Sequence, residues 1–158
     1  MLDTILSFIY GLDPWLILAI IAVTPFGEAR VAIVYGLAKG LDPAAVFFAS
    51  VFLNILVVIP LLLVLRQKFI MDIIHKIMGR KITRLVEKNK KKFELYEELA
   101  LFSFVAVPFV GTGAWTGALL STVLELDRKK SFLVIAAGVL TAGAIVFLGT
   151  NGFLHILM

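Results

Sequence analysis

The sequence predicts an all-α integral membrane protein with two inverted repeats, each a re-entrant helical hairpin followed by a transmembrane helix. Hydrophobic residues make up 61% of the 158 residues and charged residues only 16%, whereas soluble domains carry about 25% charged residues. The two halves of the chain also share short sequence motifs in the same order. We expect one membrane domain over residues 1–158, with 1–65 as the first repeat, 66–98 as a basic amphipathic connector and 99–158 as the second repeat.

The apolar residues form segments that are long enough to cross a membrane. A helix rises about 1.5 Å per residue, so about 20 residues cover a hydrocarbon core of roughly 30 Å. Three segments without Asp, Glu, Lys or Arg reach this length: residues 43–65, 99–124 and 131–158. Residues 14–38 reach it only if Glu28 and Arg30 are tolerated in the membrane. The preceding residues are too short to span and start acidic, so we expect an interfacial helix that ends near Gly11, not a signal peptide.

Short words recur in the second half of the chain at a nearly constant offset. Pro25-Phe26 recurs 83 residues later as Pro108-Phe109, and Leu41-Asp42 and Phe47 recur 85 residues later as Leu126-Asp127 and Phe132. Proline removes a backbone donor and clashes with the preceding turn, so both proline breaks interrupt a helix. Residues 14–24 and 114–124 would then form helices about 16 Å long, which is half a bilayer.

Two topologies fit these breaks. Residues 14–38 and 99–124 are either kinked full spans, which gives four crossings, or re-entrant hairpins that dip to mid-membrane and return. With hairpins, residues 128–130 join the basic connector, and thirteen of the fifteen Lys and Arg residues lie in the cytoplasm, as the positive-inside rule favours. We therefore predict hairpins that enter from opposite sides and meet near the midplane, as in transporters built from inverted repeats.

The connector holds ten of the fifteen Lys and Arg residues. Between Ile70 and Val86 the apolar residues recur at near-helical spacing, which predicts an amphipathic helix on the inner leaflet. A basic segment between two spans is the usual cytoplasmic loop. We therefore expect a multi-pass plasma-membrane protein with residues 66–98 in the cytoplasm. The basic tract at residues 88–92 has no interleaved aromatic residues, so no nucleic acid is expected as a partner.

Glu28 and Arg30 are charged residues in the middle of an apolar segment. An ionisable group at bilayer depth costs roughly 2.5–3.5 kcal/mol and needs a partner or a wet cavity. The two charges could bond each other, or each could bond the opposite hairpin. One interpretation is a structural ion pair that braces the hairpin tips. We favour a functional one, in which the planar fork of Arg30 holds an anionic headgroup or substrate and Glu28 exchanges a proton.

The second candidate segment is PFVGTGAWTG, residues 108–117. Small residues let backbones approach closely, and a broken half-helix exposes N–H groups that favour anions. No predicted strand precedes the segment, which excludes a nucleotide-binding glycine loop. Its candidate binding residues are Pro108, Gly111, Thr112, Gly113, Trp115 and Gly117. For Trp115, membrane packing is the alternative role.

Asn54 is a polar residue inside the uncharged segment 43–65 and needs a hydrogen-bond partner. A structural bond between helices and a contact with substrate both remain open for it. Cysteine is absent, and His75 and His155 are isolated, so we expect no metal site, no cofactor and no catalytic triad. The chain is therefore not expected to be an enzyme.

These residues also carry a resemblance to a known family. The motif EARVAI at residues 28–33, the later Asn54 and Pro60, and VAVPFVGTGAWTGAL at residues 105–119 resemble the small multidrug export protein family over nearly the whole chain. That family is in turn similar to the DedA (VTT) membrane proteins. This resemblance implies two re-entrant hairpins packed as inverted repeats and, in some members, flipping or scrambling of lipids. The positions that match the family's motifs, and that the resemblance therefore implies to be functional, are Glu28, Arg30, Pro108, Gly111, Gly113, Trp115 and Gly117. Val34 stands where the family often has a proline.

Taken together, the sequence predicts a small ion-coupled transporter or exporter, with the proton as the expected ion and the substrate site between the hairpin tips at the membrane midplane. One alternative is a flippase or scramblase of anionic lipids or polyprenyl-phosphate carriers. Another is a non-transporting membrane scaffold in which Glu28 and Arg30 are structural. The expected partners are membrane lipids and an anionic small-molecule or lipid substrate, and the sequence leaves a homodimer open.

Overall fold

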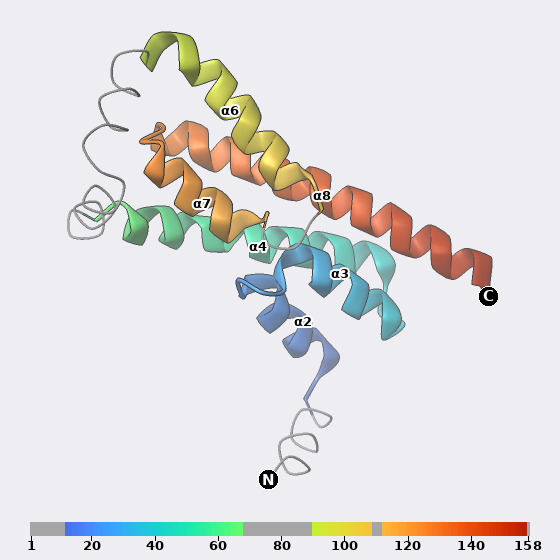
Figure 1. Ribbon diagram of the computed structural model, residues 1–158. Coiled ribbons are helices and arrows are strands. Elements are labelled where there is room, and N and C mark those ends of the chain that lie inside the picture. Colours follow the sequence, from blue (N-terminus) through green and yellow to red (C-terminus); the bar gives the residue numbers. More distant parts are fainter. Residues whose placement is uncertain (1–11, 68–89, 109–111, 158) are drawn as a thin grey trace.

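The computed structural model describes residues 12–67, 90–108 and 112–157. Within these ranges all regular secondary structure is helical and no strand occurs, which confirms the all-α prediction there. The helices are α2 (Pro14–Val23), α3 (Glu28–Ala38), α4 (Pro43–Leu65), α6 (Lys90–Ala106), α7 (Ala114–Val123) and α8 (Arg128–Leu157) (Figure 1). The predicted N-terminal interfacial helix and most of the predicted connector helix lie outside the described residues.

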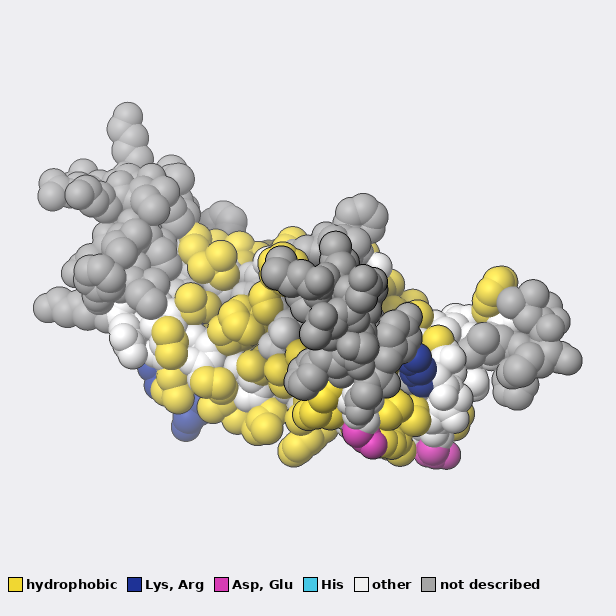
Figure 2. All heavy atoms as spheres, turned by 90° about the horizontal axis from the view of Figure 1, so that it is seen from below, with side chains coloured by type: hydrophobic (Ala, Val, Ile, Leu, Met, Phe, Trp, Pro, Cys, Tyr) yellow, Lys and Arg dark blue, Asp and Glu magenta, His cyan; other side chains and the backbone are white. Residues whose placement is uncertain are grey.

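Within the described parts of the chain, two helices are long and apolar enough to cross a membrane: α4 with 23 residues and α8 with 30. Only 28% of the apolar window of each is buried inside the protein, so most of their apolar surface faces outward and needs an apolar surrounding. They run in opposite directions along the molecule (Figure 1). Figure 2 shows hydrophobic side chains over much of one face, with basic side chains at the end where α4 ends and α8 begins.

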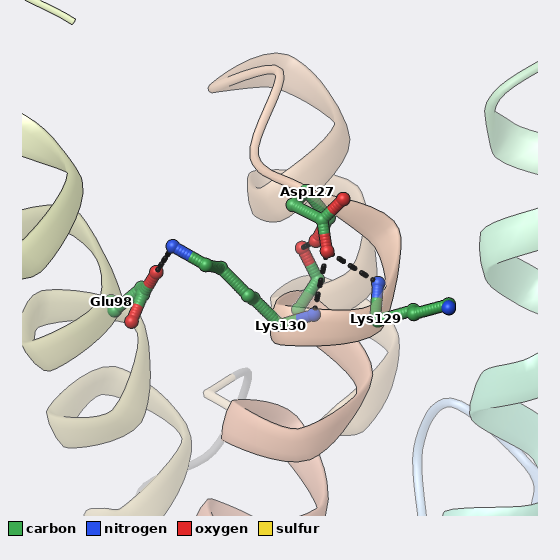
Figure 3. Close-up of polar contacts among 5 residues, drawn as sticks. Glu98, Asp127, Lys129 and Lys130 are labelled. Carbon is green, nitrogen blue, oxygen red and sulfur yellow. Dashed lines mark hydrogen bonds and ion pairs between the residues drawn. The ribbon is translucent and has the colours of Figure 1, made fainter. Parts of the chain in front are cut away.

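Aspartate begins three of the helices: Asp13 caps α2, Asp42 caps α4 and Asp127 caps α8 (Figure 3 shows Asp127). Each carboxylate accepts backbone hydrogen bonds of 2.7–3.3 Å from the first turn of its helix. These N–H groups have no partner within the helix, so the carboxylate satisfies them. The repeated Leu-Asp dipeptides therefore stand directly before the two long helices.

The turns that precede these two caps share their backbone geometry. The residue after the helix cap has a positive φ in both, 71° at Gly40 and 54° at Glu125. Hydrogen bonds of 3.0–3.1 Å close each turn in the Schellman pattern, from Gly40 N–H to Leu37 O, Leu41 N–H to Gly36 O, Glu125 N–H to Thr122 O, and Leu126 N–H to Ser121 O. The two turns thus match at the same offset of 85 residues that the sequence shows.

Glycines allow the helices of each half to pack closely. Gly36 of α3 faces Val46 of α4, while Gly117 of α7 and Gly138 of α8 both face Val105 of α6. At each glycine an added Cβ would lie 2.7 Å from the facing valine, which is closer than real Cβ atoms approach. Close backbone contact through small residues is how helices pack where no water drives them together. The buried core is aliphatic and extends through both halves.

The predicted helix breaks at Pro25 and Pro108 are confirmed, because no helix extends through either residue. Helices α2, α3 and α7 contain 10, 11 and 10 residues, so each is about 15–17 Å long and covers half a hydrocarbon core. Helix α6 runs without interruption across the boundary predicted at residues 98–99. The re-entry of the pairs α2–α3 and α6–α7 into a membrane and their inverted arrangement stay predictions.

Candidate functional site

The two broken helix pairs bring helix ends together in the interior. Helix α2 ends at Val23 and α6 ends at Ala106, while α3 begins at Glu28 and α7 at Ala114. The last turn of a helix leaves carbonyl groups without partners, and the first turn leaves N–H groups. Inside a protein or a bilayer these groups must be satisfied by side chains. The candidate residues from the sequence supply most of those side chains.

Arg30 closes the end of α6. Its Nη2 atom donates to the carbonyl oxygens of Val105, at 2.9 Å, and Thr112, at 2.6 Å, and its Nη1 atom donates to Thr112 Oγ1 at 3.2 Å. Thr112 Oγ1 in turn donates to Val107 O at 2.8 Å. The guanidinium thus lies at the negative end of the α6 dipole, where a cation is favoured, and it also fixes the segment that leads into α7.

Glu28 closes the start of α7. Its Oε1 atom accepts a hydrogen bond of 3.3 Å from the Trp115 N–H, and its carboxylate also contacts the Ala114 N–H. The side chain lies over Gly113, so closely that an added Cβ there would overlap the carboxylate. The positive end of the α7 dipole is an anion-binding site, and here an internal carboxylate occupies it.

The backbone of Glu28 has an unusual conformation. Its φ is 54°, in the left-handed region, which costs a non-glycine residue roughly 1–2 kcal/mol. The residue is only 8% exposed. Such strain persists where the surroundings over-determine the conformation, as at binding sites and switches. The contacts of the carboxylate with the start of α7 provide that determination.

Trp115 and Asn54 close the end of α2. The indole Nε1 of Trp115 donates to Val23 O at 3.1 Å, and Asn54 Nδ2 of α4 donates to Ala22 O at 2.8 Å. Each half of the chain therefore supplies side chains that bond the helix break in the other half. Charged side chains of the first half satisfy both ends of the break in the second half, and an indole from the second half satisfies a carbonyl at the break in the first.

The structure brings five of the nine predicted site residues into direct contact across the two breaks: Glu28, Arg30, Thr112, Gly113 and Trp115. Asn54 joins them through the end of α2. Gly117 instead packs against Val105 in the core, and Gly111 lies outside the described residues. Pro108 is exposed and lines the cavity described below.

Sequence reasoning missed several partners in this network. The carbonyl groups of Val23 and Val105 are backbone groups, and no side-chain pattern marks them. Thr116 bonds both backbone groups of Gly113, with Oγ1 3.0 Å from its N and 3.2 Å from its O. Thr116 stands three residues after the cap of α7, the position from which a side chain reaches back in a capping box, so this spacing could have identified it.

A cavity of about 660 Å³ adjoins the network. Its wall is formed by the break between α2 and α3, the outward side of α3, and residues from three other places in the chain: Pro108, Thr116 and Val146. The polar side chains that reach it are Glu28, Arg30 and Thr116. This size and this mixture of an apolar wall with a few convergent polar groups suit a small-molecule site. Among the described residues, no cluster of three or more His, Asp and Glu side chains could hold a metal ion.

Comparison with known proteins gives a family but no individual relative. No curated protein and no solved structure matches the chain significantly, and the relationship to the DedA proteins stays a prediction. The family match extends over residues 28–145, from the charged pair through most of α8, and therefore includes both sides of the network. Together with the two membrane-length apolar helices, this match shows that the chain is a membrane protein and belongs to the family described as "Putative small multi-drug export protein".

Proposed function

We propose that the protein is a small proton-coupled membrane transporter whose substrate enters the cavity beside Glu28 and Arg30. The family description names multi-drug export. The observation that carries the proposal is the position of the Glu28 carboxylate, which occupies the anion-binding start of α7 at the edge of a 660 Å³ cavity. The proposal includes no step that makes or breaks a covalent bond, so we assign no enzymatic activity.

Glu28 and an anionic substrate compete for the same N–H groups. An ionised carboxylate accepts stronger hydrogen bonds than a neutral one, so protonation of Glu28 weakens its hold on Trp115 and Ala114. The freed start of α7 and the nearby guanidinium of Arg30 then receive the anionic group of the substrate. Loss of the proton returns the carboxylate and expels the anion. Uptake of the proton therefore strengthens binding of the anion, and binding of the anion strengthens binding of the proton to the same extent.

The proposed topology places the two breaks at the membrane midplane, with α2–α3 and α6–α7 as hairpins that enter from opposite sides of a plasma membrane. Helices α4 and α8 cross it. The opposite directions of these two helices and the matching turns at Gly40 and Glu125 support two inverted repeats. By the positive-inside rule, residues 66–98 and 128–130 lie in the cytoplasm and Lys39 lies outside.

Flipping or scrambling of an anionic lipid is a second candidate function. The cavity wall includes Phe26, which is 95% exposed, and the exposed Val31 and Val34 of α3. In a bilayer these side chains would face lipid chains, so the cavity would open sideways to the membrane. A lipid could enter there with its phosphate at Arg30 while its chains stay in the bilayer. In the third candidate, a scaffold, Glu28 and Arg30 only brace the breaks.

Reconstitution into liposomes distinguishes the three candidates. Proteoliposomes would be tested side by side for translocation of a fluorescent anionic lipid and for efflux of a small amphiphilic anion under a pH gradient, with protein-free liposomes as the control. The transporter proposal expects efflux that depends on the gradient. Lipid translocation without efflux would replace it by the flippase, and the absence of both activities would leave the scaffold.

A further inference from the structure

A second cavity lies between the end of α4 and the start of α8. Its volume is about 400 Å³, and it shares no lining residue with the cavity at the helix breaks. The wall is apolar, with Ile59, Leu62 and Leu63 from α4 and Phe132 and Leu133 from α8. Arg128 and Lys129 complete the lining at the first turn of α8. An apolar groove thus ends at a pair of cations.

These cations lie at a helix end that does not favour them. Arg128 and Lys129 are exposed residues in the first turn of α8, where the helix dipole is positive and repels cations. The side chain of Lys129 points towards the ribbon of α4, whereas that of Lys130 turns the other way and pairs with Glu98 at 3.0 Å (Figure 3). Lys129 therefore faces the groove that it lines together with Arg128.

Arg66, directly after α4, adds a third positive charge at this end. It donates from Nη2 to Ser131 Oγ at 3.1 Å, but its buried Nε atom has no hydrogen-bond acceptor. Burial and, after it, repulsion by Arg128 lower the pKa of Arg66, although Asp127 acts in the opposite direction. An anion beside Arg128 would relieve this repulsion.

We propose that the groove between α4 and α8 binds an anionic phospholipid, with an acyl chain along Leu63 and Leu133 and the phosphate on Arg128 and Lys129. The ends of membrane-length helices lie at headgroup depth, and basic pockets between such helices bind anionic headgroups. A free anion would use the cations but leave the apolar groove empty. A neutral lipid would fill the groove but leave the cations unpaired.

Lipid retention by the full-length protein tests the site. The purified chain in detergent would be incubated with phosphatidylglycerol or with phosphatidylcholine of the same chain length, and bound lipid would be counted by native mass spectrometry. The test variant is Arg128→Gln/Lys129→Gln. The control variant Lys39→Gln/Lys130→Gln loses the same net charge away from the groove. The test substitutions remove cations from the positive end of a helix dipole, so they do not weaken α8.

We expect retention of phosphatidylglycerol to fall about 25-fold in the test variant, because each of the two cations near an anionic headgroup contributes roughly a factor of five. The control variant should retain it like the parent. Leu133→Trp, which fills the groove and keeps both cations, should also lose the lipid. Equal retention of the two lipids by the parent, an unchanged test variant, or full displacement of the lipid by inorganic phosphate would each overturn the proposal.

Discussion

Replacement of Gly113 by alanine tests whether the Glu28 carboxylate is fixed at the start of α7. The added Cβ would overlap the carboxylate, so Glu28 must leave the Trp115 N–H that lies 3.3 Å from its Oε1 atom. A hydrogen bond to a charged group contributes about 1.5–3 kcal/mol, and a carboxylate at a helix start contributes about 0.3–1 kcal/mol more. We therefore expect the free energy of unfolding to fall by about 2–4 kcal/mol.

The assay is reversible unfolding in mixed micelles, with Glu28→Ala as the second arm of a double-mutant cycle. If Gly113→Ala acts through the carboxylate, it should cost little more in the Glu28→Ala background. Gly149→Ala is the control, because an added Cβ at Gly149 meets no atom within 4 Å, and it should cost nothing. Losses that add in the double variant, or a loss in Gly113→Ala below about 0.5 kcal/mol, would refute the reasoning.

Three further predictions concern the turns and the topology. Gly40→Ala should destabilise the chain by about 1 kcal/mol, because φ is 71° at Gly40 and only the backbone strain, not a clash, opposes the new side chain. Glu125→Gly should not destabilise the chain, and a larger loss for Glu125→Gly than for Gly40→Ala in the same unfolding assay would contradict this. Hydrogen bonds from the Lys130 N–H and then the Lys129 N–H hold the pKa of Asp127 below its ordinary value. The stability that the Asp127 carboxylate contributes is therefore present above the unfolded pKa of about 3.9. It is lost as the pH falls through the lower folded pKa. In that acidic range the unfolding temperature of the parent should fall more steeply with pH than that of Asp127→Asn, and parallel curves would count against the cap. Single cysteines at positions 128–130 of this cysteine-free chain should react only from the cytoplasmic side, whereas labelling from outside alone would reinstate four crossings.

The sequence predicted the features of the fold that depend on local chemistry. The breaks at Pro25 and Pro108 followed from the missing N–H and the clash of the proline ring. The recurrence of Leu-Asp was read only as a sign of a repeat, and the structure adds that Asp42 and Asp127 cap the two long helices. The left-handed turn residue could be expected at Gly40, but Glu125 gave no such signal, because the same conformation there is imposed by the Schellman hydrogen bonds around it.

The partners within the site could not be predicted, because they are far apart along the chain. Glu28 and Trp115 are separated by 87 residues, and Arg30 and Thr112 by 82. The sequence left open whether the two charges bond each other or the opposite half. The structure shows both bonded to the opposite half, since the ends of α6 and α7 there lack partners of their own and present opposite partial charges.

The central claim is that Glu28 carries the proton that drives transport. The most direct test is pH-gradient-driven efflux from proteoliposomes that contain Glu28→Gln, with Glu125→Gln as the matched control, since both glutamates have φ at 54° and the change removes one charge at each. The account predicts that Glu28→Gln folds and binds substrate but loses the dependence on the gradient, while Glu125→Gln transports like the parent. Gradient-driven efflux at the parental rate by folded Glu28→Gln would contradict it.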